Sequence, residues 1–220
     1  AFEIVASSMN EICNSYLWFV SQHARFLSTR FDILQDIFQS VIDFLIEEET
    51  RNFAIFTLKS LFENTQFNDT FVANGLHEPF IGSLLQNDLI TDDFVIEPAS
   101  TIISYAINHG NEGNPVNDEE KERLLSLLLD PNNAKWSELS TNLDESNFPS
   151  VVCTMRSYGK AAYILGPLFI SNVMKILPSF VEVHKFFSSV SVSTNEQAII
   201  MRHVKTSIVV AIESFAKKLL

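Results

Sequence analysis

The stretch FDILQDIFQSVIDFLI, residues Phe31–Ile46, decides the fold class. Its apolar side chains recur at spacings of three and four, while aspartate and glutamine occupy positions between them. Because an α-helix completes a turn in about 3.6 residues, this spacing gathers the apolar residues on one face and the polar residues on the other. The pattern therefore predicts an amphipathic helix with one buried face.

Two more apolar runs flank this one, at Ile12–Leu27 and Phe53–Phe62. Only short connections separate the three runs, and connections of that length hold consecutive helices antiparallel. Each helix then covers the apolar face of the next. We expect Phe53, Leu58 and Phe62 to lie on the inner face of the third helix.

Helical patterns continue along the rest of the chain. Further helices are predicted within Asp69–Asn87, Pro98–Asn108, Asn117–Leu129, Ser150–Leu165 and Thr194–Leu220, and Leu168–Val190 is predicted to form one kinked helix or two short ones. Asn74-Gly75 and Pro79 interrupt the first of these patterns, so that helix has a second possible start after Leu76, with Glu78 and Pro79 in its first turn. We expect Asn117 to cap its helix and Pro131 to end it. The segment Ala134–Pro149 is then polar and irregular, with room for a short helix near Trp136.

The predicted helices fall into pairs with a regular spacing. The first helix of each pair starts near residues 3, 50, 96, 149 and 195, so the period is about 45 residues, which is typical of HEAT and armadillo repeats. An isolated pair cannot bury its apolar face, whereas stacked pairs share one core. We therefore expect an all-α fold, an α-solenoid of about four to five antiparallel helix pairs. Residues 1–220 would form a single helical-repeat segment of a longer solenoid.

Composition supports this fold class. The chain has 19 phenylalanines and only 6 glycines, which suits the packing of helices by large side chains. We find no alternating run bounded by glycine-rich turns, so a β-sheet is not expected.

Cys13 and Cys153 are far apart in the sequence and both lie in apolar runs, which predicts reduced thiols in an intracellular protein.

Charge narrows the classes of partner. The net charge of −12 disfavours direct nucleic-acid binding, which relies on lysine and arginine, and favours a protein partner with a basic segment. The long apolar stretch Ile199–Leu220 is interrupted by charged residues such as Arg202, Lys205 and Glu213. That stretch is therefore predicted to be a helix outside the membrane, and no membrane partner is expected.

Two segments of the first unit resemble a known family. FVSQHARFL at Phe19–Leu27, followed by the amphipathic helix and then by AIFTLKSL at Ala54–Leu61, resembles the repeats of karyopherin-β nuclear transport receptors of the transportin and exportin type. In that family an aromatic helix ends in a histidine-containing turn, and the next repeat often opens on an alanine-rich helix. The resemblance extends to about Thr65, and beyond it only the period agrees.

The resemblance implies a function in nuclear transport. It would make this chain an internal HEAT-repeat segment, located in the cytoplasm or the nucleus. The second helices, containing Asp32–Asp43 and Glu119–Asp130, would line the concave side that meets basic cargo or Ran. Other helical scaffolds, such as phosphatase regulatory subunits and formin inhibitory domains, give similar patterns, so the general expectation is a protein-binding scaffold.

Acidic residues are the candidate protein-binding residues. They lie on a second helix or recur at the ends of pairs, where they could form an acidic rim; the alternative is that they serve solubility and complement helix dipoles. The candidates are Asp36, Asp43, Glu47, Glu48, Glu49, Asp92, Asp93, Glu119 and Glu120. The rim predicts binding that weakens steeply with salt.

No catalytic chemistry is predicted. The five histidines are dispersed, so we expect no metal, and the glycines form no phosphate-binding loop, so we expect no cofactor. The segment Arg156–Lys160 is the one cluster of positive charge in an apolar setting, either a solvated turn of a helix or an anion site. An alternative to the scaffold is an all-α enzyme or small-ligand-binding protein with a closed apolar pocket between helices, lined by phenylalanine.

Overall fold

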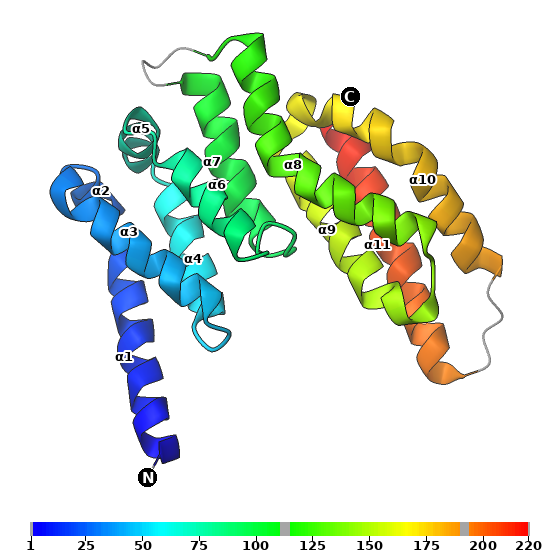
Figure 1. Ribbon diagram of the computed structural model, residues 1–220, viewed down its shortest axis with the longest axis horizontal. Helices are drawn as coiled ribbons and strands as arrows, with labels where there is room; N and C mark the ends of the chain where they lie inside the picture. Colours follow the sequence, from blue (N-terminus) through cyan, green and yellow to red (C-terminus); the bar gives the residue numbers. More distant parts are fainter. Residues whose placement is uncertain (1, 111–114, 190–193, 220) are drawn as a thin grey trace. The chain divides into compact units, whose positions relative to one another are not determined.

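The computed structural model is helical throughout (Figure 1). It describes residues 2–110, 115–189 and 194–219, and none of these residues lies in a β-strand. The all-α fold class predicted from the spacing of apolar residues is therefore confirmed. The chain divides into two compact units: unit 1 comprises Ala1–Leu89 and Thr101–Lys121, and unit 2 comprises Ile90–Ser100 and Glu122–Leu220.

The predicted positions of five helix starts agree with the structure. Helices begin at Phe2, Arg51, Ile96, Phe148 and Asn195, each within one residue of its predicted position. The agreement concerns positions along the chain. These positions could be predicted because apolar runs alternate with polar connections, and that alternation is visible in the local sequence.

Unit 1 is built around a central helix. Its helices are α1 (Phe2–Gln22), α2 (Ala24–Leu27), α3 (Phe31–Ile46), α4 (Arg51–Phe62), α5 (Thr65–Ala73), α6 (His77–Gln86) and most of α7 (Ile96–His109). The central helix is α4, which packs against both α1 and α3. Thr57 of α4 is fully buried, and its hydroxyl donates a hydrogen bond of 3.0 Å to the carbonyl of Leu17 on α1.

Phenylalanine rings form the core of unit 1. Phe38 of α3 meets Phe71 and Phe80 edge to face, with ring centroids 4.6 Å and 5.4 Å apart. Phe71 also lies 5.4 Å from Phe62 and 5.6 Å from Phe67. All five rings are at most 7% exposed. Edge-to-face contacts place the positive edge of one ring against the negative face of another, so the rings stabilise the core beyond the area they bury.

The region predicted to hold one helix between Asp69 and Asn87 holds parts of two, α5 and α6. Gly75 separates them with a φ of +69°, a left-handed conformation that glycine adopts without the steric penalty of a Cβ. The N–H of Leu76 donates to the carbonyl of Phe71 at 3.0 Å and closes the turn. The predicted start after Leu76 is therefore confirmed, because α6 begins at His77 with Glu78 and Pro79 in its first turn, whereas α5 was not predicted.

Unit 2 is dominated by the packing of α9 against α11, which run side by side in Figure 1. Its elements are the start of α7, α8 (Asp118–Thr141) from Glu122 onward, η1 (Glu145–Asn147), α9 (Phe148–Leu165), η2 (Gly166–Phe169), α10 (Ile170–Ser189) and α11 (Asn195–Leu219). A Cβ at Gly159 would lie 3.5 Å from the Cα of Ala211, so small residues allow the two helices to approach closely.

Aromatic residues with polar groups fill the core of unit 2. Trp136 is 2% exposed, and its indole N–H donates to the hydroxyl of Ser179 at 2.7 Å. Tyr158 is 1% exposed and donates to Asn133 Oδ1 at 2.9 Å, and Asn133 Nδ2 donates to Asn172 Oδ1 at 2.8 Å. Burial raises the pKa of Tyr158, so its phenol remains a neutral donor. A chain of hydrogen bonds thus runs through this core.

Among the described residues, two prolines lie beyond the first turn of a helix, Pro131 and Pro178. The prediction that Pro131 ends its helix was wrong, because α8 continues to Thr141 and includes much of the segment expected to be irregular. A proline removes one backbone hydrogen bond, but buried contacts on both sides hold this helix together: Asn132, for example, is buried and donates to the carbonyl of Ile90 at 3.2 Å. Pro178 lies within α10, which is one helix, as one of the two alternatives predicted.

Candidate protein-binding surface and pocket

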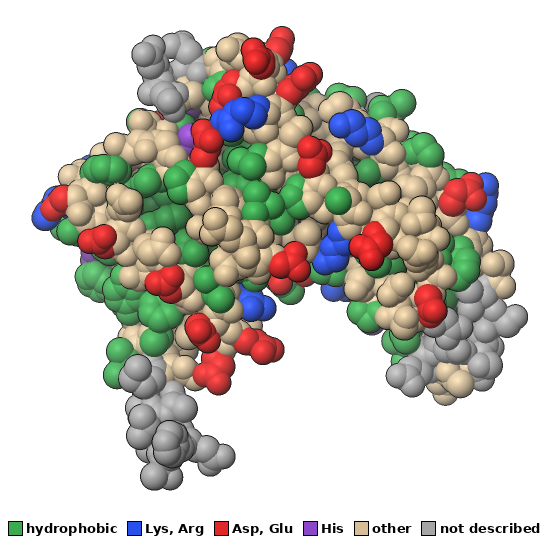
Figure 2. Space-filling model, viewed as in Figure 1, with side chains coloured by type: hydrophobic (Ala, Val, Ile, Leu, Met, Phe, Trp, Pro, Cys, Tyr) green, Lys and Arg blue, Asp and Glu red, His purple; other side chains and the backbone are tan. Residues whose placement is uncertain are grey.

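The acidic charge of the chain is concentrated in unit 1. Unit 1 holds 16 aspartate and glutamate residues against 5 lysine and arginine residues, a net charge of −11. Unit 2 holds 11 against 10, a net charge of −1. Figure 2 shows acidic side chains over the α3–α4 connection and over the start of α8. Electrostatic attraction for cationic groups is therefore stronger at unit 1 than at unit 2.

Asp36 and Asp43 lie on the exposed face of α3. They share that face with Asp32, so an acidic stripe runs along the helix. Asp43 accepts a hydrogen bond of 3.0 Å from Gln39, while Asp32 pairs with Arg30 at 2.7 Å. The hydrogen bond from Arg30 lowers the pKa of Asp32. Within the described residues, Asp36 and Asp43 have no cationic partner, so their charge is available to a ligand.

Glu47–Glu49 form the connection between α3 and α4, and all three are exposed. They follow the C-terminal end of α3, where the helix dipole favours cations. Arg51 supplies the positive charge at that end, because its guanidinium donates to the carbonyls of Leu45 and Ile46, both at 3.0 Å. Complementarity to the dipole of α3 therefore does not explain these three carboxylates. They also precede the N-terminus of α4, where the dipole favours anions, and Glu49 accepts a hydrogen bond of 2.5 Å from Asn10.

Asp92 and Asp93 have local partners in unit 2. Asp92 accepts the backbone N–H of Phe94 at 2.7 Å just before α7 begins, as a capping residue does. Asp93 is 8% exposed, and its carboxylate lies 3.8 Å from the ammonium of Lys160. Lys160 also donates to the backbone carbonyl of Asp93 and lies 4.4 Å from the ring centre of Phe94. These contacts account for both carboxylates without an external ligand.

Glu119 and Glu120 lie in the first turn of α8. Asn117 Oδ1 accepts the N–H of Glu120 at 2.8 Å, so the predicted cap is confirmed. Asp118 pairs with Lys121 at 2.8 Å, and the hydrogen bond from this lysine lowers the pKa of Asp118. Carboxylates at a helix N-terminus are favoured by the dipole, so this cluster has a local explanation.

The structure brings only some of the predicted site residues together. Asp36, Asp43 and Glu47–Glu49 share α3 and the connection that follows it, which we call the α3 acidic surface. The start of α8 lies at the opposite end of unit 1 in Figure 1, so Glu119 and Glu120 do not join this surface. Asp92 and Asp93 belong to unit 2.

An aromatic hollow on unit 1 was missed by the sequence analysis. Trp18 of α1 and Phe53 and Phe56 of α4 are 59%, 46% and 54% exposed, and with Asn52 and Thr57 they line an open hollow of about 310 Å³. The prediction that Phe53 faces inward was wrong. The signal was present: Phe53 and Phe56 are three residues apart, off the stripe of α4 that is buried, so α4 has a second apolar face.

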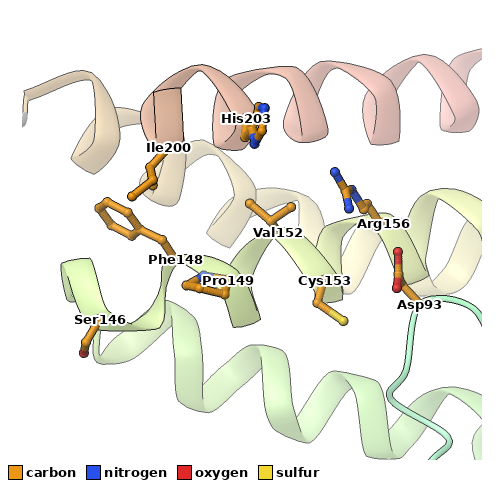
Figure 3. A pocket seen from close by; sticks show the side chains of 9 residues that line it. All are labelled: Asp93, Ser146, Phe148, Pro149, Val152, Cys153, Arg156, Ile200 and His203. Carbon is orange, nitrogen blue, oxygen red and sulfur yellow. The ribbon is translucent and has the colours of Figure 1, made fainter. Parts of the chain in front are cut away.

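Unit 2 contains an open pocket of about 420 Å³ along α9 and α11 (Figure 3). It is lined by Phe148, Pro149, Val152, Cys153, Arg156, Ile200, His203, Ser146 and Asp93. Val152 and Arg156 project from α9 toward α11, which carries Ile200 and His203. The pocket differs from the closed, phenylalanine-lined cavity of the alternative hypothesis, because it is open and Phe148 is its only phenylalanine.

The predicted cationic cluster Arg156–Lys160 is divided between two roles. Lys160 is engaged by Asp93 and Phe94, whereas Arg156 is exposed in the pocket and has no hydrogen-bond or ion-pair partner within the described residues. Burial raises the pKa of Cys153, so its thiol remains protonated at neutral pH and is a poor nucleophile.

Two further properties of the described ranges concern metal ligands and membrane spans. Over these ranges no group of three or more histidine, cysteine, aspartate or glutamate residues is placed to hold a metal ion. One continuous stretch, Phe148–Ser189, is long and apolar enough to cross a membrane, and 39% of its most apolar window is buried within the protein. Core helices reach the same length and hydropathy, so this stretch does not identify a membrane protein.

No protein-family model and no curated protein matches this sequence.

Proposed function

We propose that this chain is a helical scaffold that binds a protein partner carrying a basic, amphipathic segment, and that unit 1 holds the binding surface. The observation that carries the proposal is that one unit has both the net charge of −11 and the exposed aromatic hollow. Carboxylates steer a basic segment toward the surface, and a hollow lined by tryptophan and phenylalanine supplies apolar contact.

The two features are close along the chain. The acidic connection ends at Glu49, and the hollow begins at Asn52 and Phe53 in the first turn of α4. A segment that places a leucine or methionine against Trp18 therefore has Glu47–Glu49 within reach of its flanking lysines or arginines.

The repeat architecture belongs to the same proposal. Helix starts spaced by 45 to 52 residues support an α-solenoid of antiparallel pairs, and the resemblance of Phe19–Leu27 and Ala54–Leu61 to transport-receptor repeats supports a karyopherin-like segment. On this proposal the partner is a basic cargo segment or Ran, and the protein acts in the cytoplasm or the nucleus.

The test is binding of a synthetic peptide in which lysines alternate with leucines at helical spacing, with Ran as a second ligand. We expect the affinity for the peptide to fall steeply between low and high salt. The triple variant Glu47→Lys, Glu48→Lys and Glu49→Lys should lower the association rate about tenfold or more. Trp18 emission should shift to shorter wavelength as the peptide covers the indole.

A matched control changes the same charge elsewhere. Asp130→Lys, Glu138→Lys and Glu182→Lys reverse three exposed carboxylates of unit 2 and should alter the rate much less. Equal effects of the two triple variants would show that only net charge matters and would remove unit 1 as the site. Unchanged binding in Trp18→Ser would remove the hollow from the proposal.

A further inference from the structure

The pocket in unit 2 is polarised along its length. Phe148 and Ile200 meet at one end, Val152 and His203 lie in the middle, and Arg156 lies toward the other end, beside Asp93 (Figure 3). Eight residues of helix separate Phe148 from Arg156, which corresponds to about 12 Å along the axis of α9. An apolar wall thus leads to a cationic end.

The cationic end is available to a ligand. Arg156 and His203 are both exposed, and neither forms a hydrogen bond or an ion pair with a described residue. The guanidinium is charged at every physiological pH and presents a planar set of donors that matches a carboxylate. The imidazole of His203, in the middle of the pocket, supplies a further N–H donor.

Asp93, the carboxylate in the lining, does not cancel this charge. Its negative charge is offset by Lys160, whose ammonium lies 3.8 Å away and also donates to the backbone carbonyl of Asp93. Cys153 remains a neutral thiol because burial raises its pKa. Unit 2 as a whole is close to neutral, so it does not repel an anion as unit 1 does.

We propose that this pocket binds a small carboxylate with an apolar chain, such as a medium-length acyl carboxylate. Arg156 holds the carboxylate, while Phe148, Val152 and Ile200 cover the chain and His203 lies beside its middle. The volume of about 420 Å³ lies within the range of small-molecule sites. The proposal is independent of partner binding by unit 1, because every lining residue belongs to unit 2.

The experiment is titration of the isotopically labelled protein with decanoate, below the concentration at which decanoate aggregates, followed by NMR. We expect saturable shifts of the backbone amides of Val152, Cys153 and Arg156. Decanol, which has the same chain and no charge, should bind at least about tenfold more weakly, because a charge-assisted bidentate contact is lost. Acetate, which keeps the charge and lacks the chain, should also bind far more weakly.

Substitutions test each end of the pocket. Arg156→Gln should weaken decanoate binding about tenfold and leave decanol binding unchanged. Arg202→Gln is the matched control, because Arg202 is an exposed arginine of α11 that does not line the pocket, and it should have little effect. Val152→Phe should block both ligands by filling the groove, with helical content checked by circular dichroism.

Several outcomes would overturn the proposal. Decanoate that shifts only amides around Trp18 and Phe56 would place the ligand on the aromatic hollow of unit 1. Equal affinities for decanoate and decanol, or equal losses in Arg156→Gln and Arg202→Gln, would remove the carboxylate contact. An absence of saturable shifts in unit 2 would remove the site altogether.

Discussion

The two units of this chain reach stable helical cores by different chemistry. Unit 1 packs five phenylalanine rings against one another, with no polar atom in those side chains. Unit 2 uses tryptophan and tyrosine, whose polar groups are satisfied by Ser179 and Asn133. The surfaces differ as well: net charges are −11 and −1.

The largest effect should come from the phenylalanine cluster. Phe71→Ala removes a fully buried ring that contacts three others and should lower the free energy of unfolding of unit 1 by about 3–5 kcal/mol. Denaturant unfolding followed by circular dichroism measures the change. Phe56→Ala, which truncates an exposed ring, should cost far less, and a similar loss in both variants would show that the cluster is not the core of unit 1.

The hydrogen-bonded core of unit 2 should respond to loss of one oxygen atom. Tyr158→Phe leaves Asn133 Oδ1 without its donor and should cost about 1–3 kcal/mol in chemical denaturation. The matched change in unit 1 is Tyr105→Phe, which breaks a hydrogen bond of 2.6 Å to the partly exposed Asp69, where water can replace the donor. The contrast between the units fails if Tyr105→Phe costs as much as Tyr158→Phe.

A smaller loss is expected at the end of α3. Arg51→Ala removes the donors to the carbonyls of Leu45 and Ile46 and should lower the free energy of unfolding by about 1 kcal/mol. Exchange of the amide hydrogens in the last turn of α3 should accelerate, because this end frays more readily. Arg25→Ala is the control, since Arg25 is exposed on α2; equal destabilisation would mean that Arg51 acts through general charge.

The smallest effect concerns titration of the acidic surface. The hydrogen bond from Arg30 lowers the pKa of Asp32, so Arg30→Gln should raise that pKa toward its ordinary range. A lowered folded pKa contributes stability above the unfolded pKa, and this stability is lost as pH falls through the folded pKa. NMR titration of the Asp32 carboxyl measures the shift, which should be absent in Lys185→Gln of unit 2.

Local sequence predicted the helices well where the apolar spacing and the capping residue are unambiguous. Apolar spacing identified α3, and Asn117 was placed correctly as a cap. The predicted helix start after Gly75 and Leu76 was confirmed, whereas the predicted helix end at Pro131 was wrong. At Gly75 the backbone adopts a left-handed turn that separates α5 from α6, whereas at Pro131 tertiary contacts carry α8 through a residue that usually ends a helix.

The candidate site was predicted less completely. Exposure of Asp36, Asp43 and Glu47–Glu49 followed from their positions opposite or beyond the apolar stripe of α3. The aromatic hollow did not, because an apolar residue such as Phe53 is expected to be buried unless its neighbours are known. The pocket in unit 2 was also missed, since Arg156 and His203 are 47 positions apart in the sequence.

The sequence by itself determined the helical class, the spacing of helix starts and the excess of negative charge, because each depends on residue type and short-range periodicity. Only the tertiary structure decided which phenylalanines are buried, which carboxylates have partners and which side chains from distant helices line one pocket. These properties depend on contacts between residues far apart in the chain, and helical periodicity carries no information about such contacts.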